Sequence, residues 1–280
     1  MQNLSGRHAV ITGGSSGIGL ATAHALGQRG ARLTLMARRA ELLDAAVAEL
    51  ADRGVEATGR SVDVSDHAAV DAAFAAAVAE RGPVDVLVCS AGVARPGYFE
   101  ELDDEVFRQM IEVDYFGTLW PIRAVVPSMI ERRSGSIVGV SSGAGIIGVF
   151  GYTAYGPAKF AVRGLLEALR AEMAPYGIHV GCCFPPDVDT PQLAYENRFK
   201  PDETRAISGS IKPISADRVA DCIVAGIDKE RFALVPDRGT RLLAVGAGLA
   251  PRLITSVTDR AAAKARARRL ARTDRDSPPL

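Results

Sequence analysis

The chain has 280 residues, which is more than the roughly 150 of an average domain but within the range of one large α/β domain. It carries 33 basic and 33 acidic residues, and 48% of its residues are hydrophobic, as in ordinary globular proteins. This balance argues against a disordered chain, a collagen and a nucleic-acid-coating polycation, so we expect no nucleic-acid partner.

The four cysteines, Cys89, Cys182, Cys183 and Cys222, form no Cys-x-x-Cys pair and have no histidine cluster beside them. This spacing suggests neither a metal site nor a disulfide framework, and a reducing cytoplasm is expected. The first residues do not have the pattern of a signal peptide. The longest late apolar run, residues 242–250, is too short for a membrane-spanning helix.

Short apolar runs alternate with longer segments of helical composition, a pattern typical of βαβ units. The expected strands are 8–12, 32–37, 56–63, 84–90, 136–141, 179–184 and 232–235. Residues 39–53 and 68–81, rich in Ala, Leu, Glu and Arg, predict two of the crossover helices. Right-handed crossovers give a doubly wound parallel α/β sheet of about seven strands, with ligands beyond the carboxyl ends of the strands.

Two stretches depart from this alternation. Residues 185–215 contain five prolines and no strand signal, which favours a lid or a substrate-binding loop. Residues 260–275 are rich in alanine and arginine, and they follow the apolar run at 242–250. We therefore expect one domain at 1–240, which includes the substrate loop, and an apolar and basic helical extension at 241–280.

The first expected strand leads into a glycine-rich turn, Thr12-Gly13-Gly14-Ser15-Ser16-Gly17-Ile18-Gly19, followed at once by a helical segment. Free backbone N–H groups at a helix start, and glycines that allow close approach, suit a pyrophosphate. The spacing Gly-x-x-x-Gly-x-Gly differs from the Gly-x-Gly-x-x-Gly of the commonest dinucleotide fingerprint. The alternative is a glycine turn without a ligand.

The second expected strand ends at Ala37-Arg38-Arg39, and no carboxylate follows before Glu41. An acidic residue at this point binds the ribose 2′-hydroxyl of NADH, whereas an arginine pairs with the 2′-phosphate of NADPH. NADPH is therefore the expected cofactor. The alternative is that both arginines only face solvent, at a helix start where the dipole disfavours cations.

Tyr155 and Lys159 lie four residues apart in a segment that becomes helical, and so share one helix face. We expect the Lys159 ammonium to lower the pKa of the Tyr155 phenol, so that the phenol exchanges a proton near neutral pH. Ser142 can donate a hydrogen bond to a substrate oxygen as negative charge develops there. The spacing alone is a weak signal, because a half-buried tyrosine beside a solvated lysine would share it.

Together the glycine turn at 12–19, Ser90-Ala91-Gly92, Ser142 and Tyr155-x-x-x-Lys159 resemble the short-chain dehydrogenase/reductases over about residues 5–235. The resemblance implies a Rossmann-type domain and a homodimer or homotetramer. It also implies that Tyr155 is the catalytic acid/base, Ser142 orients the carbonyl, and Lys159 holds the nicotinamide ribose. Ser141 is adjacent, but the thirteen-residue spacing to Tyr155 favours Ser142.

The resemblance also implies a set of cofactor contacts. These are Gly13, Ser15, Ser16, Gly17, Ile18, Gly19, Arg38, Arg39, Asp63, Val64, Ser90, Ala91, Gly92, Tyr155, Lys159, Pro185, Val188 and Thr190. Three positions depart from the family pattern: Ser90 and Asp114 replace asparagines, and Pro186 replaces a glycine. In the family, the backbone carbonyl at the position of Asp114 holds a water connected to the lysine. A carboxylate there could alter the proton relay, so Asp114 is not counted as catalytic.

Within the family, several stretches resemble the 3-ketodihydrosphingosine reductases: 115–124, 150–155, 184–191 and parts of 196–205. This implies NADPH-dependent reduction of a long-chain apolar ketone, 3-ketodihydrosphingosine, to dihydrosphingosine. The alternatives are another ketone or secondary alcohol, such as a steroid, a 3-oxoacyl compound or a xenobiotic, and a non-catalytic NADP(H)-binding sensor.

The apolar run at 242–250, with Leu253, Ile254 and the basic residues 260–272, could lie on the inner surface of an anionic membrane. The alternative is that the apolar part packs on the domain or at a subunit interface while the basic part is solvated. We favour this alternative, because peripheral membrane binding needs both signals on one surface.

Overall fold

The computed structural model describes residues 4–208, 212–250, 252, 255–256 and 259–267. Its central sheet has seven strands in the order β3-β2-β1-β4-β5-β6-β9, all paired in parallel. The strands are β1 (His8–Thr12), β2 (Arg32–Ala37), β3 (Ala57–Ser61), β4 (Val86–Cys89), β5 (Gly135–Val140), β6 (Ile178–Cys183) and β9 (Ala233–Leu234). The predicted doubly wound α/β sheet is confirmed.

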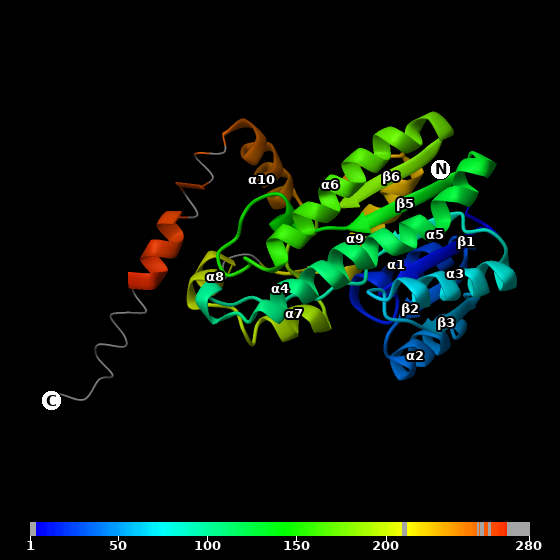
Figure 1. Ribbon diagram of the computed structural model, residues 1–280, viewed down its shortest axis with the longest axis horizontal. Helices are drawn as coiled ribbons and strands as arrows, with labels where there is room; N and C mark the ends of the chain where they lie inside the picture. Colours follow the sequence, from blue (N-terminus) through cyan, green and yellow to red (C-terminus); the bar gives the residue numbers. More distant parts are fainter. Residues whose placement is uncertain (1–3, 209–211, 251, 253–254, 257–258, 268–280) are drawn as a thin grey trace.

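Helices cover both faces of this sheet (Figure 1). One face is covered by α1 (Gly17–Gly27), α2 (Ala40–Ala51) and α9 (Ala216–Asp228). The other is covered by α3 (His67–Arg81), α5 (Gly117–Arg132) and α6 (Tyr155–Met173). Each layer buries an apolar cluster against the strands, and these two clusters form most of the core.

The short helix α4 (Asp104–Met110) joins α5 through a π-helical turn at Ile111–Phe116. Such turns are rare and occur frequently at functional sites. This one places the Asp114 side chain in the interior of the domain, where it is fully buried.

The strand order reverses between β1 and β4, which leaves a crevice at the carboxyl ends of these strands. The segments that follow β1, β4, β5 and β6 all begin at this edge: the glycine turn, residues 90–92, Ser142 and Pro185. The fold therefore brings together motifs that lie far apart in the sequence.

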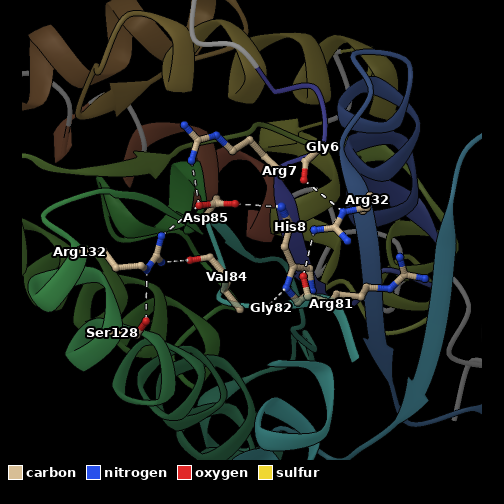
Figure 2. A network of polar contacts seen from close by, with 10 residues as sticks. All are labelled: Gly6, Arg7, His8, Arg32, Arg81, Gly82, Val84, Asp85, Ser128 and Arg132. Carbon is tan, nitrogen blue, oxygen red and sulfur yellow. Dashed lines mark hydrogen bonds and ion pairs between the residues drawn. The ribbon is translucent and has the colours of Figure 1, made fainter. Parts of the chain in front are cut away.

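A polar network joins elements at the opposite, amino edge of the sheet (Figure 2). The Asp85 carboxylate accepts hydrogen bonds from Arg7 Nη1 at 3.2 Å, Arg132 Nη1 at 3.1 Å and the His8 backbone N–H at 3.1 Å. Arg132 also donates to the Val84 carbonyl at 2.7 Å. These bonds connect the starts of β1 and β4 to the end of α5.

The substrate loop differs from the prediction of a loop without strands. It contains β7 (Val188–Asp189), α7 (Pro191–Glu196), α8 (Asp202–Ser208) and β8 (Ile214–Ser215), and the two strands pair in parallel. Two-residue strands are too short to show an alternating pattern, so periodicity could not reveal them. Helix α7 begins where Thr190 Oγ1 accepts a hydrogen bond from the Leu193 N–H at 3.3 Å, with Pro191 in its first turn.

Beyond β9 the chain forms α10 (Arg238–Leu249), and residues 259–267 are again helical. Both lie at the end of the molecule away from α2 and β3 (Figure 1). None of the helices in the described part of the chain is long and apolar enough to span a membrane. Leu253, Ile254 and residues 268–272 of the predicted extension lie outside the described residues.

Candidate active site

A cavity of about 580 Å³ opens at the carboxyl edge of the sheet. It brings together nearly all of the residues predicted to contact the cofactor or substrate. Those that line it are Gly13, Ser15, Ser16, Gly17, Ile18, Arg38, Arg39, Val64, Ser90, Ala91, Gly92, Ser142, Tyr155, Lys159, Pro185, Val188 and Thr190. Gly19 and Asp63 do not line the cavity, and both lie next to residues that do.

The glycine turn forms one end of this cavity. Gly13 has φ +69°, and a Cβ atom there would lie 2.7 Å from the Ala91 backbone nitrogen, so only glycine fits. A Cβ atom at Gly19 would lie 2.2 Å from the Gly13 carbonyl oxygen, which shows how tightly α1 packs on the turn. The start of α1 is thus held against the residues after β4, with its N–H groups available to an anion.

Two arginines follow β2 at the rim of the same end. Arg38 Nη1 lies 4.0 Å from Asp63 Oδ2, and both side chains are about half exposed. The Asp63 Oδ1 atom accepts hydrogen bonds from the Ser65 N–H at 3.0 Å and the Ser65 hydroxyl at 2.7 Å. Because α2 begins at Ala40, the guanidinium groups lie at a helix start, where a bound anion would offset their repulsion by the dipole.

Tyr155 is the first residue of α6, and Lys159 lies one turn further along the helix. Both are buried, and Lys159 Nζ lies 5.5 Å from the centre of the Tyr155 ring. Ser142 is the second residue after β5, and its hydroxyl lies within hydrogen-bonding reach of Tyr155. The neighbouring Ser141 hydroxyl instead donates to the Lys159 carbonyl at 2.9 Å, so it fixes the backbone of α6. This geometry supports Ser142 as the serine that faces a substrate.

Asp114 adds a buried carboxylate to this group. Its Oδ1 atom lies 3.1 Å from Lys159 Nζ and accepts a hydrogen bond from the Val93 N–H at 3.1 Å. Its Oδ2 atom has no hydrogen-bond partner among the described residues. Lys159 Nζ also donates to the Val140 carbonyl at 3.2 Å. The Lys159 ammonium is therefore paired with a carboxylate inside the protein.

This arrangement raises the pKa of Tyr155 well above its ordinary value. Burial is the largest cause, followed by the negative charges of Asp114 and Glu196, while the hydrogen bond with Ser142 acts in the opposite direction. The pKa of Tyr155 is therefore raised and not lowered as predicted, because burial outweighs any effect of Lys159 and the charge of Asp114 acts in the same direction as burial. Burial also raises the pKa of Asp114, against the effect of Lys159. Near neutral pH Tyr155 is a protonated phenol that can donate a proton.

The other end of the cavity is formed mainly by the substrate loop. The Tyr152 hydroxyl donates to Glu196 Oε2 at 2.9 Å, and Gln192 Nε2 donates to Glu196 Oε1 at 3.1 Å. The rings of Tyr152 and Tyr155 have centres 5.6 Å apart. Apolar side chains complete this end, among them Val149, Leu193, Ile207 and Leu243.

Sequence reasoning gave no role to Tyr152 or Glu196, although both lie in stretches that carry the resemblance. Tyr152 precedes Tyr155 by three residues, which was the available signal for a shared surface. No local signal indicated Glu196, because it meets Tyr152 only through the packing of α7.

Comparisons with known proteins agree with this geometry. A model of the family described as short chain dehydrogenase matches residues 7–201. The chain is 44% identical over 263 residues to 3-dehydrosphinganine reductase from Danio rerio, covering 91% of this chain and 78% of the relative. It is 42% identical over 262 residues to 3-ketodihydrosphingosine reductase from Mus musculus, with the same coverage of each.

Solved structures show the same architecture. A short chain dehydrogenase/reductase from Burkholderia phymatum in complex with NAD is 25% identical, with a TM-score of 0.81 over 90% of this chain and 96% of that one. A short-chain dehydrogenase from Streptomyces avermitilis is 31% identical, with a TM-score of 0.78 over 93% and 98%. The chain therefore belongs to the short-chain dehydrogenase/reductase family and is an oxidoreductase.

Proposed function

We propose that this protein is an NADPH-dependent reductase that converts the keto group of 3-ketodihydrosphingosine to the alcohol of dihydrosphingosine. The observation that carries the proposal is one continuous cavity that has arginines at one end, the Tyr155–Ser142 pair in its wall and apolar side chains at the other end. The names of the relatives from Danio rerio and Mus musculus support this substrate.

The residues at the glycine end fit a nicotinamide dinucleotide phosphate. The turn around Gly13 and the start of α1 offer backbone N–H groups for a pyrophosphate, with Ser15 and Ser16 beside them. Arg38 and Arg39 would hold the 2′-phosphate, because both line this end of the cavity and no carboxylate follows β2 before Glu41. Ser90, Ala91 and Gly92 would lie behind the nicotinamide ribose, with Lys159 as its polar partner.

The reduction requires a hydride, which the reduced nicotinamide supplies when bound, and a proton, which this chain supplies. Ser142 donates a hydrogen bond to the ketone oxygen and holds it beside the Tyr155 hydroxyl. As negative charge develops on that oxygen, the Tyr155 hydroxyl transfers its proton and the product is a neutral alcohol. Lys159, held by the Asp114 carboxylate and the Val140 carbonyl, keeps a positive charge below the Tyr155 ring.

The proposal is tested with a panel of ketones, monitored by the absorbance of NADPH. We expect 3-ketodihydrosphingosine to be reduced with a higher kcat/KM than a steroid ketone or a 3-oxoacyl thioester. Tyr155→Phe should lower kcat by about 100-fold or more, since it removes the proton donor. Tyr176→Phe, in the turn after α6 and away from the cavity, is the matched control and should retain activity.

Two results would contradict the proposal. Faster reduction of another ketone would reassign the substrate. Absence of turnover by the wild-type protein on every ketone, with retained binding of NADPH, would favour the non-catalytic sensor.

A further inference from the structure

We propose that Glu196 forms a subsite for a substrate ammonium group carried on the carbon next to the reacting carbonyl. This inference rests on the proposed function and deepens it, because 3-ketodihydrosphingosine is a 2-amino ketone and its amine is charged near neutral pH. None of the features used above to support a ketoreductase distinguishes an amino ketone from a neutral ketone. Glu196 supplies that distinction.

Glu196 is placed next to the reacting groups. It is the last residue of α7, its exposed fraction is 8%, and it lines the same cavity as Tyr155 and Ser142. Tyr152 connects it to Tyr155, since its hydroxyl binds Glu196 Oε2 and its ring adjoins that of Tyr155. The Glu196 charge is close enough to raise the pKa of Tyr155. Glu196 is therefore in the same part of the cavity as the group that would hold a substrate carbonyl.

No cation is among the direct hydrogen-bond partners of Glu196. Both of its hydrogen-bond donors, Tyr152 and Gln192, are neutral. Among the described residues no lysine or arginine forms an ion pair with it; the positive charge of Lys200 acts on it without direct contact, because Lys200 Nζ binds Asp187 Oδ2 at 2.8 Å. A buried carboxylate without a counter-ion is costly, and burial accordingly raises the pKa of Glu196. A bound ammonium would provide the missing counter-ion.

The distribution of charge along the cavity matches an amphipathic amino ketone. The arginines at the cofactor end suit a phosphate, and Lys159 between the two ends is paired with Asp114. Glu196 lines the same cavity, and Leu193, Ile207 and Leu243 add apolar surface for a hydrocarbon chain. A steroid or an anionic acyl thioester would leave Glu196 buried without a counter-ion, so the subsite also selects against them.

The test compares two substrates that differ only in the amine: 3-ketodihydrosphingosine and its deaminated counterpart, 1-hydroxyoctadecan-3-one. In Glu196→Gln we expect the ratio of kcat/KM for the amino ketone to that for the neutral ketone to fall by about 10- to 100-fold, because a charge-assisted hydrogen bond is lost. The change should appear mainly in KM. Glu196→Asp, which keeps the charge, should retain part of the preference.

Glu203→Gln is the matched control. Glu203 is also a buried carboxylate of the substrate loop that accepts a tyrosine hydrogen bond, from the Tyr98 hydroxyl at 2.8 Å, but it does not line the cavity. Its substitution should leave the ratio unchanged. Thermal unfolding of each variant, followed by circular dichroism, separates a folding defect from a change in selectivity.

An unchanged ratio in Glu196→Gln, or an equal loss for both ketones, would overturn the subsite. If the wild-type protein reduces neither ketone, the proposed function fails, and calorimetry with NADP⁺ present then tests the subsite alone. Dihydrosphingosine should bind the wild type at least about tenfold more tightly than Glu196→Gln, whereas octadecane-1,3-diol should show no such difference. Equal binding of the amine to both proteins, or none to either, would overturn it.

Discussion

The chemistry of single residues at this site depends on the negative charge beside Lys159. With a carboxylate at position 114, Lys159 Nζ has a counter-ion 3.1 Å away, and burial together with the charges of Asp114 and Glu196 raises the pKa of Tyr155. Both effects favour the protonated phenol. A protonated tyrosine is the form that ketone reduction needs, whereas alcohol oxidation needs the phenolate as base. We therefore expect Asp114 to favour reduction over oxidation near neutral pH.

We predict that Asp114→Asn shifts the pH dependence of catalysis. Removing a negative charge favours the phenolate, so the pKa of Tyr155 should fall toward its ordinary value. Since reduction is lost as pH rises through that pKa, its alkaline limb should move to lower pH. Oxidation of dihydrosphingosine near neutral pH should rise several-fold. Profiles of kcat against pH in both directions check this, and profiles that coincide with those of the wild type would contradict it.

Arg38 allows a separate prediction about the cofactor. Its guanidinium lines the cavity where a 2′-phosphate would bind, so Arg38→Ala should raise KM for NADPH by about tenfold or more. KM for NADH, which has no 2′-phosphate, should change little. Arg53→Ala, just past the far end of α2, is the control, because Arg53 pairs with Glu49 and does not line the cavity. Equal effects of Arg38→Ala on both cofactors would show that the arginine is not a phosphate ligand.

Some of these residue-level features could be predicted from the sequence and others could not. Nearly every predicted site residue belongs to a motif that follows a strand. These motifs meet because parallel strands bring their carboxyl ends to one edge of the sheet. The ion pair between Asp114 and Lys159 spans 45 positions and depends on how a π-helical turn faces α6. The direction of the Tyr155 pKa shift depends on that contact, so it required the structure.

At the scale of elements, the strands were predictable because buried parallel strands are short apolar runs. Each expected strand of the main sheet agrees with the observed one to within two residues at either end. The substrate loop was not predictable, because its strands have two residues each and its helices six and seven. Its structure depends on contacts with other segments. One is the hydrogen bond that the Thr204 hydroxyl donates to the Phe150 carbonyl at 2.8 Å.

The carboxyl edge of the sheet carries the cavity, whereas the amino edge carries a polar network, and this difference leads to a prediction about stability. Asp85 joins the starts of β1 and β4 to α5 at the edge away from the cavity (Figure 2). Asp85→Ala removes charge-assisted hydrogen bonds and should lower the free energy of unfolding by about 2–3 kcal/mol. Urea unfolding measures this change. At a temperature where the variant is folded, kcat/KM should equal that of the wild type, and a loss of activity in the folded variant would contradict the separation of the edges.

For the whole molecule, α10 connects the cavity to an exposed apolar surface. Leu243 of α10 lines the cavity, whereas Leu242, Val245 and Leu249 expose 73%, 54% and 83% of their surface. Their spacing of three and four residues places them on one face of α10. Arg241 is exposed on α10. Arg260, Lys264 and Arg266 are exposed on the separate helical segment 259–267. The chain thus exposes both apolar and basic side chains in its carboxy-terminal helices, the two kinds of group that peripheral membrane binding requires.

We therefore predict that this face binds anionic lipid surfaces. The wild-type protein should sediment with phosphatidylcholine vesicles that contain phosphatidylserine, and binding should weaken at high salt. A triple variant, Leu242→Ser, Val245→Ser and Leu249→Ser, should bind at least about tenfold more weakly, because three apolar side chains no longer enter the interface. Leu42→Ser, at an exposed position of α2 that does not line the cavity, is the control. If the triple variant sediments like the wild type, the face is not a lipid contact. If instead it changes the oligomeric state in analytical ultracentrifugation, the face is a subunit interface, as the favoured alternative holds.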